Sequence, residues 1–148
     1  MDENIGTMLA QVSRLIRRSF DERARAICVT RPQWQVLSIL KRNSGINQGG
    51  LAEILEVEPI TAGRMIDRLQ EARLVERRPD PMDRRVWRLY LTPKGEKLLE
   101  DLRPFARETF EIALEGISEA EQAQLLAMLD RMRANLTRKP QVEAAVDG

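Results

Sequence analysis

The sequence predicts a mostly α-helical chain with one small β-hairpin: a winged helix-turn-helix with long helices at its N- and C-terminal ends. Three observations predict this fold class. Residues 59–72 repeat apolar side chains at helical spacing, residues 74–91 read as two short strands joined by a turn rich in Asp and Arg, and long amphipathic stretches precede and follow both. A helix that can enter a groove, beside a hairpin that can flank it, is typical of a DNA-binding protein.

Charge is unevenly distributed along a chain that is nearly neutral overall. The length of 148 residues predicts a single domain over 1–148. The chain holds 24 Lys and Arg against 23 Asp and Glu. Residues 1–57 hold 8 basic and 6 acidic groups, residues 58–97 hold 10 and 7, and residues 98–148 hold 6 and 10. Positive charge therefore collects at the predicted helix and hairpin, where a polyanion would bind.

Residue types that the sequence lacks exclude several classes of function. Histidine, the commonest general base and the commonest metal ligand, is absent. The single cysteine, Cys28, cannot form an internal disulfide, and no glycine-rich phosphate loop occurs. We therefore expect no enzyme, no metal site and no cofactor.

Neither a membrane span nor a secretion signal is predicted. No segment reaches the roughly 18 to 20 consecutive apolar residues that a spanning helix needs. The acidic start at residues 1–4 is unlike a signal peptide. We expect a cytoplasmic protein that does not bind membranes.

Two helices are predicted before residue 46. Apolar residues at steps of three and four over 5–27 indicate an amphipathic helix. Thr30 and Gln33 form the pattern of a capping box, which begins a second helix that carries Trp34 toward the core and ends at residues 43–45.

A helix-turn-helix is predicted next. Ile46 adds a brief edge strand, and Asn47 caps a short helix over 48–55, although each glycine in its first turn costs about 1 kcal/mol relative to Ala. Pro59 begins the following helix, since its missing N–H does no harm there. The buried stripe of that helix consists of Ala62, Met65, Ile66, Leu69 and Ala72.

The hairpin has one inward and one outward face. Strand alternation places Trp87, Leu89 and Leu91 on the inward face and Val86, Arg88 and Tyr90 on the other. Pro79 and Pro81 end the strand and stiffen the turn.

Two further helices follow the hairpin. Thr92 caps a helix that runs from Lys94 to about Glu115, is kinked by the proline at position 104 and ends at Gly116. Ser118 begins a capping box for the last helix, and the polar segment 137–148 is predicted to be a disordered tail.

The exposed face of the helix over 59–72 carries the candidate base-reading residues. Arg64 can reach a guanine edge, where its fork matches two acceptors, while Ile60 and Thr61 can meet base edges or a thymine methyl. Arg68, one turn further on, is expected to contact phosphate or to pair with a neighbouring acid. The alternative is an ordinary solvated helix face.

The hairpin turn carries the candidate minor-groove residues. Arg85 is the first choice for insertion into a narrow groove, and Arg84 is either the competing choice or a phosphate contact. Asp80 and Asp83 cannot attract DNA, so we expect them to orient the arginines and to accept hydrogen bonds from the turn. An ordinary charged hairpin turn is the alternative.

The terminal helices have more apolar surface than the small middle of the chain can cover. A symmetric homodimer would cover this surface, and packing of the helices on one another within the monomer is the alternative. The candidate dimer-interface residues are Ile5, Leu9, Leu125, Leu129, Met132 and Leu136.

The order of these elements resembles the MarR family of bacterial transcriptional regulators. The resemblance extends from about Ile5 to Leu136, and its most specific parts are the Asp-Pro-Met-Asp-Arg-Arg run at 80–85 and the Leu-Thr-Pro-Lys-Gly run at 91–95. Family wings commonly read Asp-x-Arg-Asp-x-Arg, and Met82 takes the place of the first arginine here.

The resemblance implies a dimer that binds palindromic double-stranded DNA operators, often as a repressor, and that is often released by a small aromatic or phenolic effector. It implies a DNA-binding lobe over 31–92 and a helical dimerisation region over 1–30 and 93–136. It also implies an effector pocket where the first, second and fifth helices meet. The candidate pocket residues are Arg14, Arg17, Arg18 and Trp34, for which simple core packing or a solvated helix face is the alternative.

A protein-interaction module is the rival function, because winged-helix folds also serve that purpose. Such a module needs neither paired arginines at the tip of the wing nor an exposed Arg64. The sequence therefore favours DNA binding.

Overall fold

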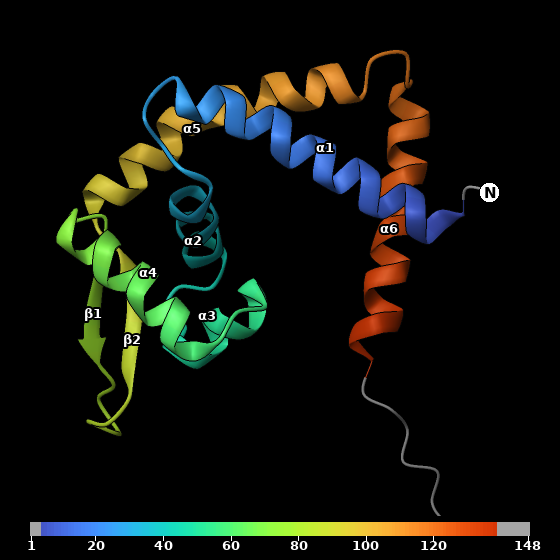
Figure 1. Cartoon of the computed structure of the whole chain (residues 1–148). Helices are drawn as coiled ribbons and strands as arrows, with labels where there is room; N and C mark the ends of the chain where they lie inside the picture. Colours follow the sequence, from blue (N-terminus) through green and yellow to red (C-terminus); the bar gives the residue numbers. More distant parts are fainter. Residues whose placement is uncertain (1–3, 139–148) are drawn as a thin grey trace, which may run out of the picture. The chain divides into compact units, whose positions relative to one another are not determined.

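A computed structural model describes residues 4–138 and confirms the predicted fold class (Figure 1). The chain forms two compact units, the first ending at Phe110 and the second beginning at Glu111. The elements are α1 (Ile5–Arg25), α2 (Arg31–Arg42), α3 (Gln48–Leu55), α4 (Pro59–Glu71), β1 (Val75–Pro79), β2 (Trp87–Leu91), α5 (Pro93–Ala113) and α6 (Glu119–Thr137).

Side-chain caps begin the helices where the sequence predicts them. Thr30 and Gln33 form a reciprocal capping box at α2. The Asn47 side chain accepts a hydrogen bond from the Gly50 amide at 2.8 Å, and the Thr92 hydroxyl accepts one from the Gly95 amide at 3.0 Å. These bonds satisfy amides that have no partner inside the helix, and they fix where each helix starts.

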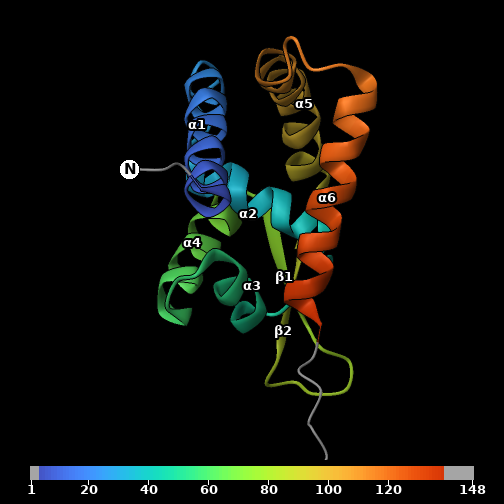
Figure 2. The ribbon, with the colours of Figure 1, turned by 90° about the vertical axis from the view of Figure 1, so that its right-hand side faces the viewer.

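The helix-turn-helix consists of α3 and α4, which pack on each other (Figure 2). Their short connection turns at Glu56, which adopts the left-handed conformation with φ 56°. The Gln48 side-chain amide donates to the Pro59 carbonyl oxygen at 2.9 Å and ties the start of α3 to the start of α4. The connection therefore fixes the angle between α3 and α4.

The predicted edge strand at Ile46 is corrected to an isolated bridge. Asn47 and Arg88 form this bridge, next to which the Leu89 amide donates to the Ile46 carbonyl and the Gly45 amide donates to the Leu89 carbonyl. The chain turns into α3 at once, because Asn47 is already the N-cap of that helix. The link still ties the α2–α3 connection to β2.

One buried cluster holds α2, α3, α4 and the hairpin together. Its members are Val36, Leu37, Leu40, Leu51, Ile66, Leu69, Leu74, Val75 and Leu89. The predicted stripe of α4 is confirmed at Ala62, Ile66 and Leu69, which are buried, while Met65 and Ala72 are half-buried at its margin.

The prediction that Trp87 packs inward is wrong. Leu89 is buried, but Trp87 is 49% exposed. Trp87 pairs with Pro79 at the outer end of the antiparallel hairpin, whereas Val75 pairs with Leu91 at its inner end. The alternation is therefore right, but the hairpin extends past the helices that could cover its outer end (Figure 2).

A second buried cluster joins α1 to α5 within the first unit. Ala24, Val29 and Leu102 are its buried members. Trp34 lies beside it, edge to face with Phe20 at a ring-centroid distance of 4.8 Å. Helix α1 ends two residues before the predicted Ile27, and Cys28 in the following turn adopts φ 61°.

The second unit contains the end of α5 and helix α6. The chain leaves α5 after Ala113 and turns at Gly116, whose φ of 79° suits glycine. Ser118 and Glu121 form the predicted capping box at α6. Helix α5 continues through Pro104. Of the predicted tail, Thr137 is the last residue of α6, and residues 139–148 lie outside the described residues.

No helix between residues 4 and 138 is both long and apolar enough to cross a membrane.

Substitution of Gly95 by Ala should destabilise the protein by about 1 to 3 kcal/mol, because the added Cβ would overlap the Leu74 carbonyl group, which is backbone and cannot rotate away. Urea unfolding followed by circular dichroism measures this loss. Substitution of Gly49 by Ala is the matched control. Its Cβ would meet only the Asn47 side-chain oxygen at 3.6 Å, so a gain of up to about 1 kcal/mol from helix propensity is expected. Equal effects of the two substitutions would contradict this account.

Candidate nucleic-acid interface

Helix α4 presents four predicted contact residues on its exposed face. Its buried side packs on the core, which leaves Ile60, Thr61, Arg64 and Arg68 in solvent. Ile60 is 65% exposed, which is unusual for a large apolar side chain unless it serves a contact. The Arg64 and Arg68 guanidinium groups make no hydrogen bond or ion pair with other described residues.

The turn of the wing is closed by its own backbone and by Asp80. The Asp80 amide donates to the Val86 carbonyl at 2.8 Å, and the Val86 amide donates to the Asp83 carbonyl at 3.0 Å. One carboxylate oxygen of Asp80 accepts from the amides of Met82 and Asp83, at 2.7 and 3.1 Å. The turn is therefore preorganised, and Met82 stands 94% exposed at its tip.

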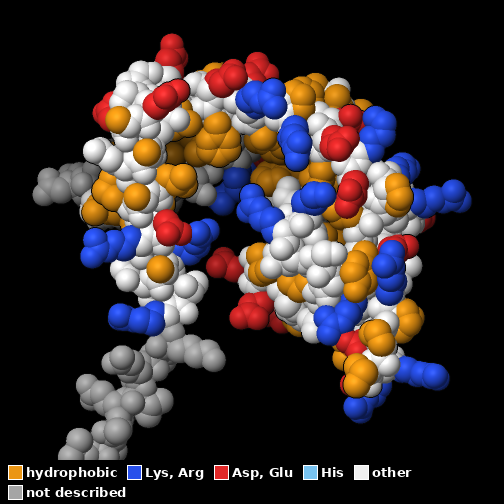
Figure 3. Space-filling model, turned by 180° about the vertical axis from the view of Figure 1, so that it is seen from behind, with side chains coloured by type: hydrophobic (Ala, Val, Ile, Leu, Met, Phe, Trp, Pro, Cys, Tyr) orange, Lys and Arg blue, Asp and Glu red, His pale blue; other side chains and the backbone are white. Residues whose placement is uncertain are grey.

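Asp83 holds the guanidinium of Arg85 at the tip. The Arg85 Nε donates to Asp83 Oδ1 at 3.2 Å, and the Arg85 amide donates to the same oxygen at 3.0 Å. The Arg85 side chain is nonetheless 90% exposed, so it projects from the turn. Arg84 is exposed as well, without a partner in the described part of the chain. The wing in the lower right of Figure 3 carries basic side chains that project outward beside hydrophobic ones.

The second carboxylate oxygen of Asp80 binds Arg88 rather than Arg84 or Arg85, the arginines that it was predicted to orient. The Arg88 Nε lies 2.6 Å from Asp80 Oδ2. The hydrogen bonds that Asp80 accepts from the Met82 amide and from Arg88 hold the pKa of its carboxyl below the ordinary value, because both stabilise the ionised form.

Two arginines of the hairpin are engaged with neighbouring groups rather than free. Arg77 in β1 donates to Gln70 and Asp67 of α4, each at 2.6 Å, and so joins the hairpin to α4. Arg78 lies over the Tyr90 ring at 4.5 Å and pairs with Glu76. Neither Arg77 nor Arg88 is among the predicted site residues. Their places inside strands, rather than at the turn, are the signal that could have found them.

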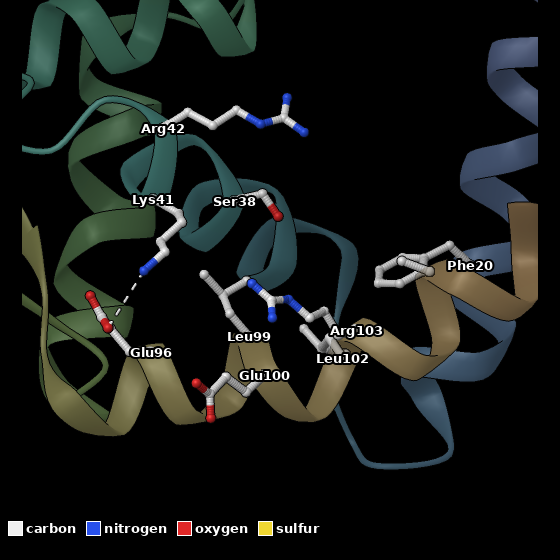
Figure 4. A pocket seen from close by; sticks show the side chains of 10 residues that line it. Phe20, Ser38, Lys41, Arg42, Glu96, Leu99, Glu100, Leu102 and Arg103 are labelled. Carbon is white, nitrogen blue, oxygen red and sulfur yellow. Dashed lines mark ion pairs between the residues drawn. The ribbon is translucent and has the colours of Figure 1, made fainter. Parts of the chain in front are cut away.

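A cavity of about 270 Å³ lies between α1, α2 and α5 within the first unit (Figure 4). Its lining residues are Phe20, Ser38, Lys41, Arg42, Glu96, Leu99, Glu100, Leu102, Arg103 and Ala106. Lys41 and Glu96 form an ion pair at one side of it, with 3.6 Å between Nζ and Oε2.

The four predicted pocket residues do not line this cavity. Arg14, Arg17 and Arg18 are exposed on α1. Trp34 is half-buried, and its indole N–H donates to Asp21 at 2.7 Å. The structure thus places a cavity at the expected junction of helices, with a different set of side chains around it.

The helix-turn-helix, the exposed basic face of α4 and the rigid basic wing together define a winged-helix DNA-binding fold. The MarR family model matches residues 29–87. The chain is 34% identical over 110 residues to the uncharacterized HTH-type transcriptional regulator YybA of Bacillus subtilis (strain 168), across 74% of this chain and 73% of YybA.

Solved structures agree with this match. The structure of the transcriptional regulator PA3341 is similar, with 36% identity, coverage of 90% of this chain and 98% of the other, and a TM-score of 0.78. A MarR transcriptional regulator from Methanosarcina mazei Go1 is similar at 29% identity, 88% and 94% coverage, and a TM-score of 0.77. The chain belongs to the MarR family of transcriptional regulators.

The Asp80 carboxyl should titrate at a lower pH than an Asp in an unstructured peptide, because two amides and Arg88 hold its ionised form. A group with a lowered folded-state pKa stabilises the fold above its unfolded pKa, and that contribution is lost as the pH falls through the folded value. Carboxyl carbon NMR across an acid titration measures the midpoint. A midpoint at the peptide value would contradict the hydrogen-bond geometry of the turn.

Proposed function

We propose that this regulator acts as a homodimer on a palindromic double-stranded DNA operator and represses transcription there. One observation supports this proposal most: Arg64 on α4 and Arg84 on the wing are exposed without partners in the described chain, and Arg85 projects from the same turn of the wing. All three belong to one compact unit. Arg77 and Arg88, in contrast, are held by acceptors of α4, of the turn and of the α2–α3 connection. Exposed guanidinium groups on a helix and an adjacent wing suit the two grooves of one DNA half-site.

In this proposal α4 reads the major groove. Arg64 discriminates guanine by about 1 to 3 kcal/mol through its paired donors, and Ile60 and Thr61 contact base edges or a thymine methyl. Arg68 contacts phosphate and fixes the register of the helix. The wing places Arg85 in the minor groove, with Arg84 on phosphate or as the inserted group, while Asp80 and Asp83 keep the turn in shape.

The dimer is proposed from apolar side chains on the long helices. In the first unit, Ile5 and Leu9 are exposed on α1; in the second, Leu125, Leu129 and Met132 are each more than a third exposed and Leu136 is mostly exposed on α6. Exposed apolar stripes of this kind mark association surfaces. A twofold pair of recognition helices spaced roughly 34 Å apart would require a palindromic operator. The lobe over 31–92 and the dimerisation region over 1–30 and 93–136 belong to this proposal.

A small aromatic acid or phenol is the proposed effector. The cavity in the first unit offers Phe20, Leu99 and Leu102 to a ring and Lys41 and Arg103 to an anion. Ligand binding would favour a dimer geometry that no longer fits the operator, which requires different affinities in the two states. Release of operator by an added aromatic carboxylate in a gel-shift titration would support this role, and an unchanged titration would refute it for that ligand.

A protein-interaction module without specific DNA binding is the second candidate. Its support is three large apolar side chains that are exposed on α4 and on the wing, those of Ile60, Met82 and Trp87. The unpartnered arginines favour DNA.

Substitution of Arg85 by Ala should weaken operator binding at least tenfold while leaving the fold intact, since a minor-groove contact is lost.

Substitution of Arg64 by Ala should reduce the free energy of operator binding by about 1 to 3 kcal/mol and relax selectivity at one base pair. Selection of bound sequences from a random DNA pool supplies the operator, and gel-shift titration supplies the affinities.

Substitution of Arg107 by Ala is the control for the loss of one positive charge, because this residue is exposed on α5 outside the proposed lobe. It should leave affinity unchanged. A salt series should give a log–log slope of about −0.9 per neutralised phosphate. Wild-type affinity in the Arg85→Ala variant would refute the assignment of Arg85 to the minor groove. A DNA pool without an enriched sequence would favour the protein-interaction module.

Substitution of Leu129 by Glu should dissociate the dimer, because a charge would be buried at the proposed interface. The side chain is already 37% exposed in the single chain, so the helix itself should survive. Sedimentation at micromolar concentration measures the assembly. Ala127, on the opposite face of α6, provides the control, and Ala127→Glu should remain dimeric. A stable monomer of the wild-type protein would refute the architecture.

A further inference from the structure

Arg88 is held by two groups that lie far apart in the sequence. Its Nε donates to Asp80 Oδ2 at 2.6 Å, and its second guanidinium nitrogen donates to the Gly45 carbonyl oxygen at 2.8 Å. The guanidinium therefore bridges the turn of the wing and the connection between α2 and α3. With these donors used, Arg88 is not a free cation like Arg64.

The two groups that Arg88 joins are each fixed by other bonds. The opposite oxygen of Asp80 holds the amides of Met82 and Asp83, so movement of this carboxylate moves the tip. Gly45 has φ 86°, its amide donates to the Leu89 carbonyl, and any added Cβ would meet the Tyr90 hydroxyl at 3.2 Å. The bridge thus runs from a rigid tip to a rigid corner.

The turn of the wing has one side-chain link to the rest of the first unit, and that link is Arg88. Among the described side chains of residues 78–88, only that of Arg88 makes a hydrogen bond to a residue outside the hairpin, the Gly45 carbonyl in the α2–α3 connection. Arg77 ties the middle of the hairpin to α4, and backbone hydrogen bonds join Leu89, its strand partner, to Gly45 and Ile46. Without the Arg88 side chain, the tip could move about these attachments.

We infer that Arg88 is a positioning residue that sets the wing tip at the place where Arg85 must meet DNA, without contacting DNA itself. This inference rests on the proposed function. A contact group displaced by about 1 Å loses most of its benefit. Arg88 therefore acts on DNA affinity only through Arg85 and its neighbours at the tip.

The sign of one substitution separates positioning from charge. Asp80→Asn removes a negative charge from the wing, which by electrostatics alone would strengthen binding to a polyanion. It also replaces one of the two acceptor oxygens by an NH2 donor, so the turn amides and Arg88 can no longer both be held, and positioning predicts weaker binding. Glu76→Gln is the matched control, because it removes a carboxylate from the same hairpin that pairs with Arg78 and not with Arg88.

The charge on Arg88 can be kept while the bridge is broken. Arg88→Lys retains a cation but lacks the planar fork that reaches two acceptors at once. A phosphate contact made by residue 88 would survive this substitution in large part, whereas the bridge would not. Together with Asp80→Asn, this variant keeps the test open if Arg88→Ala fails to fold.

The experiment is a gel-shift titration of the full chain on the operator selected by the wild-type protein. We expect Arg88→Ala, Arg88→Lys and Asp80→Asn each to weaken binding by about tenfold, and Glu76→Gln to bind as tightly as wild type or more tightly. The double variant Arg85→Ala with Arg88→Ala should bind no more weakly than Arg85→Ala alone, because nothing remains to be positioned. Amide NMR relaxation without DNA should show greater mobility at Met82 in each bridge variant.

Three results would overturn the inference: wild-type affinity in the Arg88 variants, tighter binding by Asp80→Asn, or additive losses in the double variant. The last would make Arg88 a direct contact. Failure of the wild-type protein to select any operator would instead refute the proposed function, and this inference with it. Wild-type binding with unaffected Arg88 variants would refute the positioning role alone.

Discussion

Burial of the inner face of α4 is the interaction on which the rest of this structure depends. Ile66 and Leu69 are almost fully buried in a cluster that also holds Leu37, Leu51 and Leu89, so α2, α3, α4 and the hairpin share one core. Each of these side chains contributes about 1.5 to 3 kcal/mol when it is fully buried. Because the inner face of α4 is fixed in this way, its other face must point to solvent, and the arginines on it can serve a ligand.

The hairpin shows how a protein separates structural arginines from exposed ones. Arg77 and Arg88 are held by Asp67, Asp80 and neutral acceptors of the same unit, while Arg84 remains exposed at the turn. The difference follows from position. A side chain within a strand lies beside the helices and can reach their acceptors, whereas a side chain at the tip has only the turn for a neighbour. Acidic residues in a DNA-binding wing are therefore compatible with its function, since they fix its shape.

Local sequence signals predicted the elements because they act over a few residues. The caps at Thr30, Asn47 and Ser118 and the glycine at 116 are contacts within one turn, and each lies where the sequence places it. Local signals gave wrong predictions at Trp87 and Ile46. Alternation predicts which face of a strand a side chain lies on, but not how far along the strand a covering helix extends, so Trp87 is left exposed. Ile46 cannot continue as a strand, because the next residue, Asn47, already caps α3.

The sequence by itself determined the helix-turn-helix, the wing, the family and the residues that face away from the core, because periodicity and capping are local and the family motifs are short. Only the tertiary structure decided which charged groups are paired. Asp80 pairs with Arg88, which is eight residues away in the sequence, and Arg88 also binds the carbonyl of Gly45, which is 43 residues away. The lining of the cavity between α1, α2 and α5 was likewise decided by packing rather than by helical spacing. Contacts at such separations depend on how the elements dock, which no local pattern records.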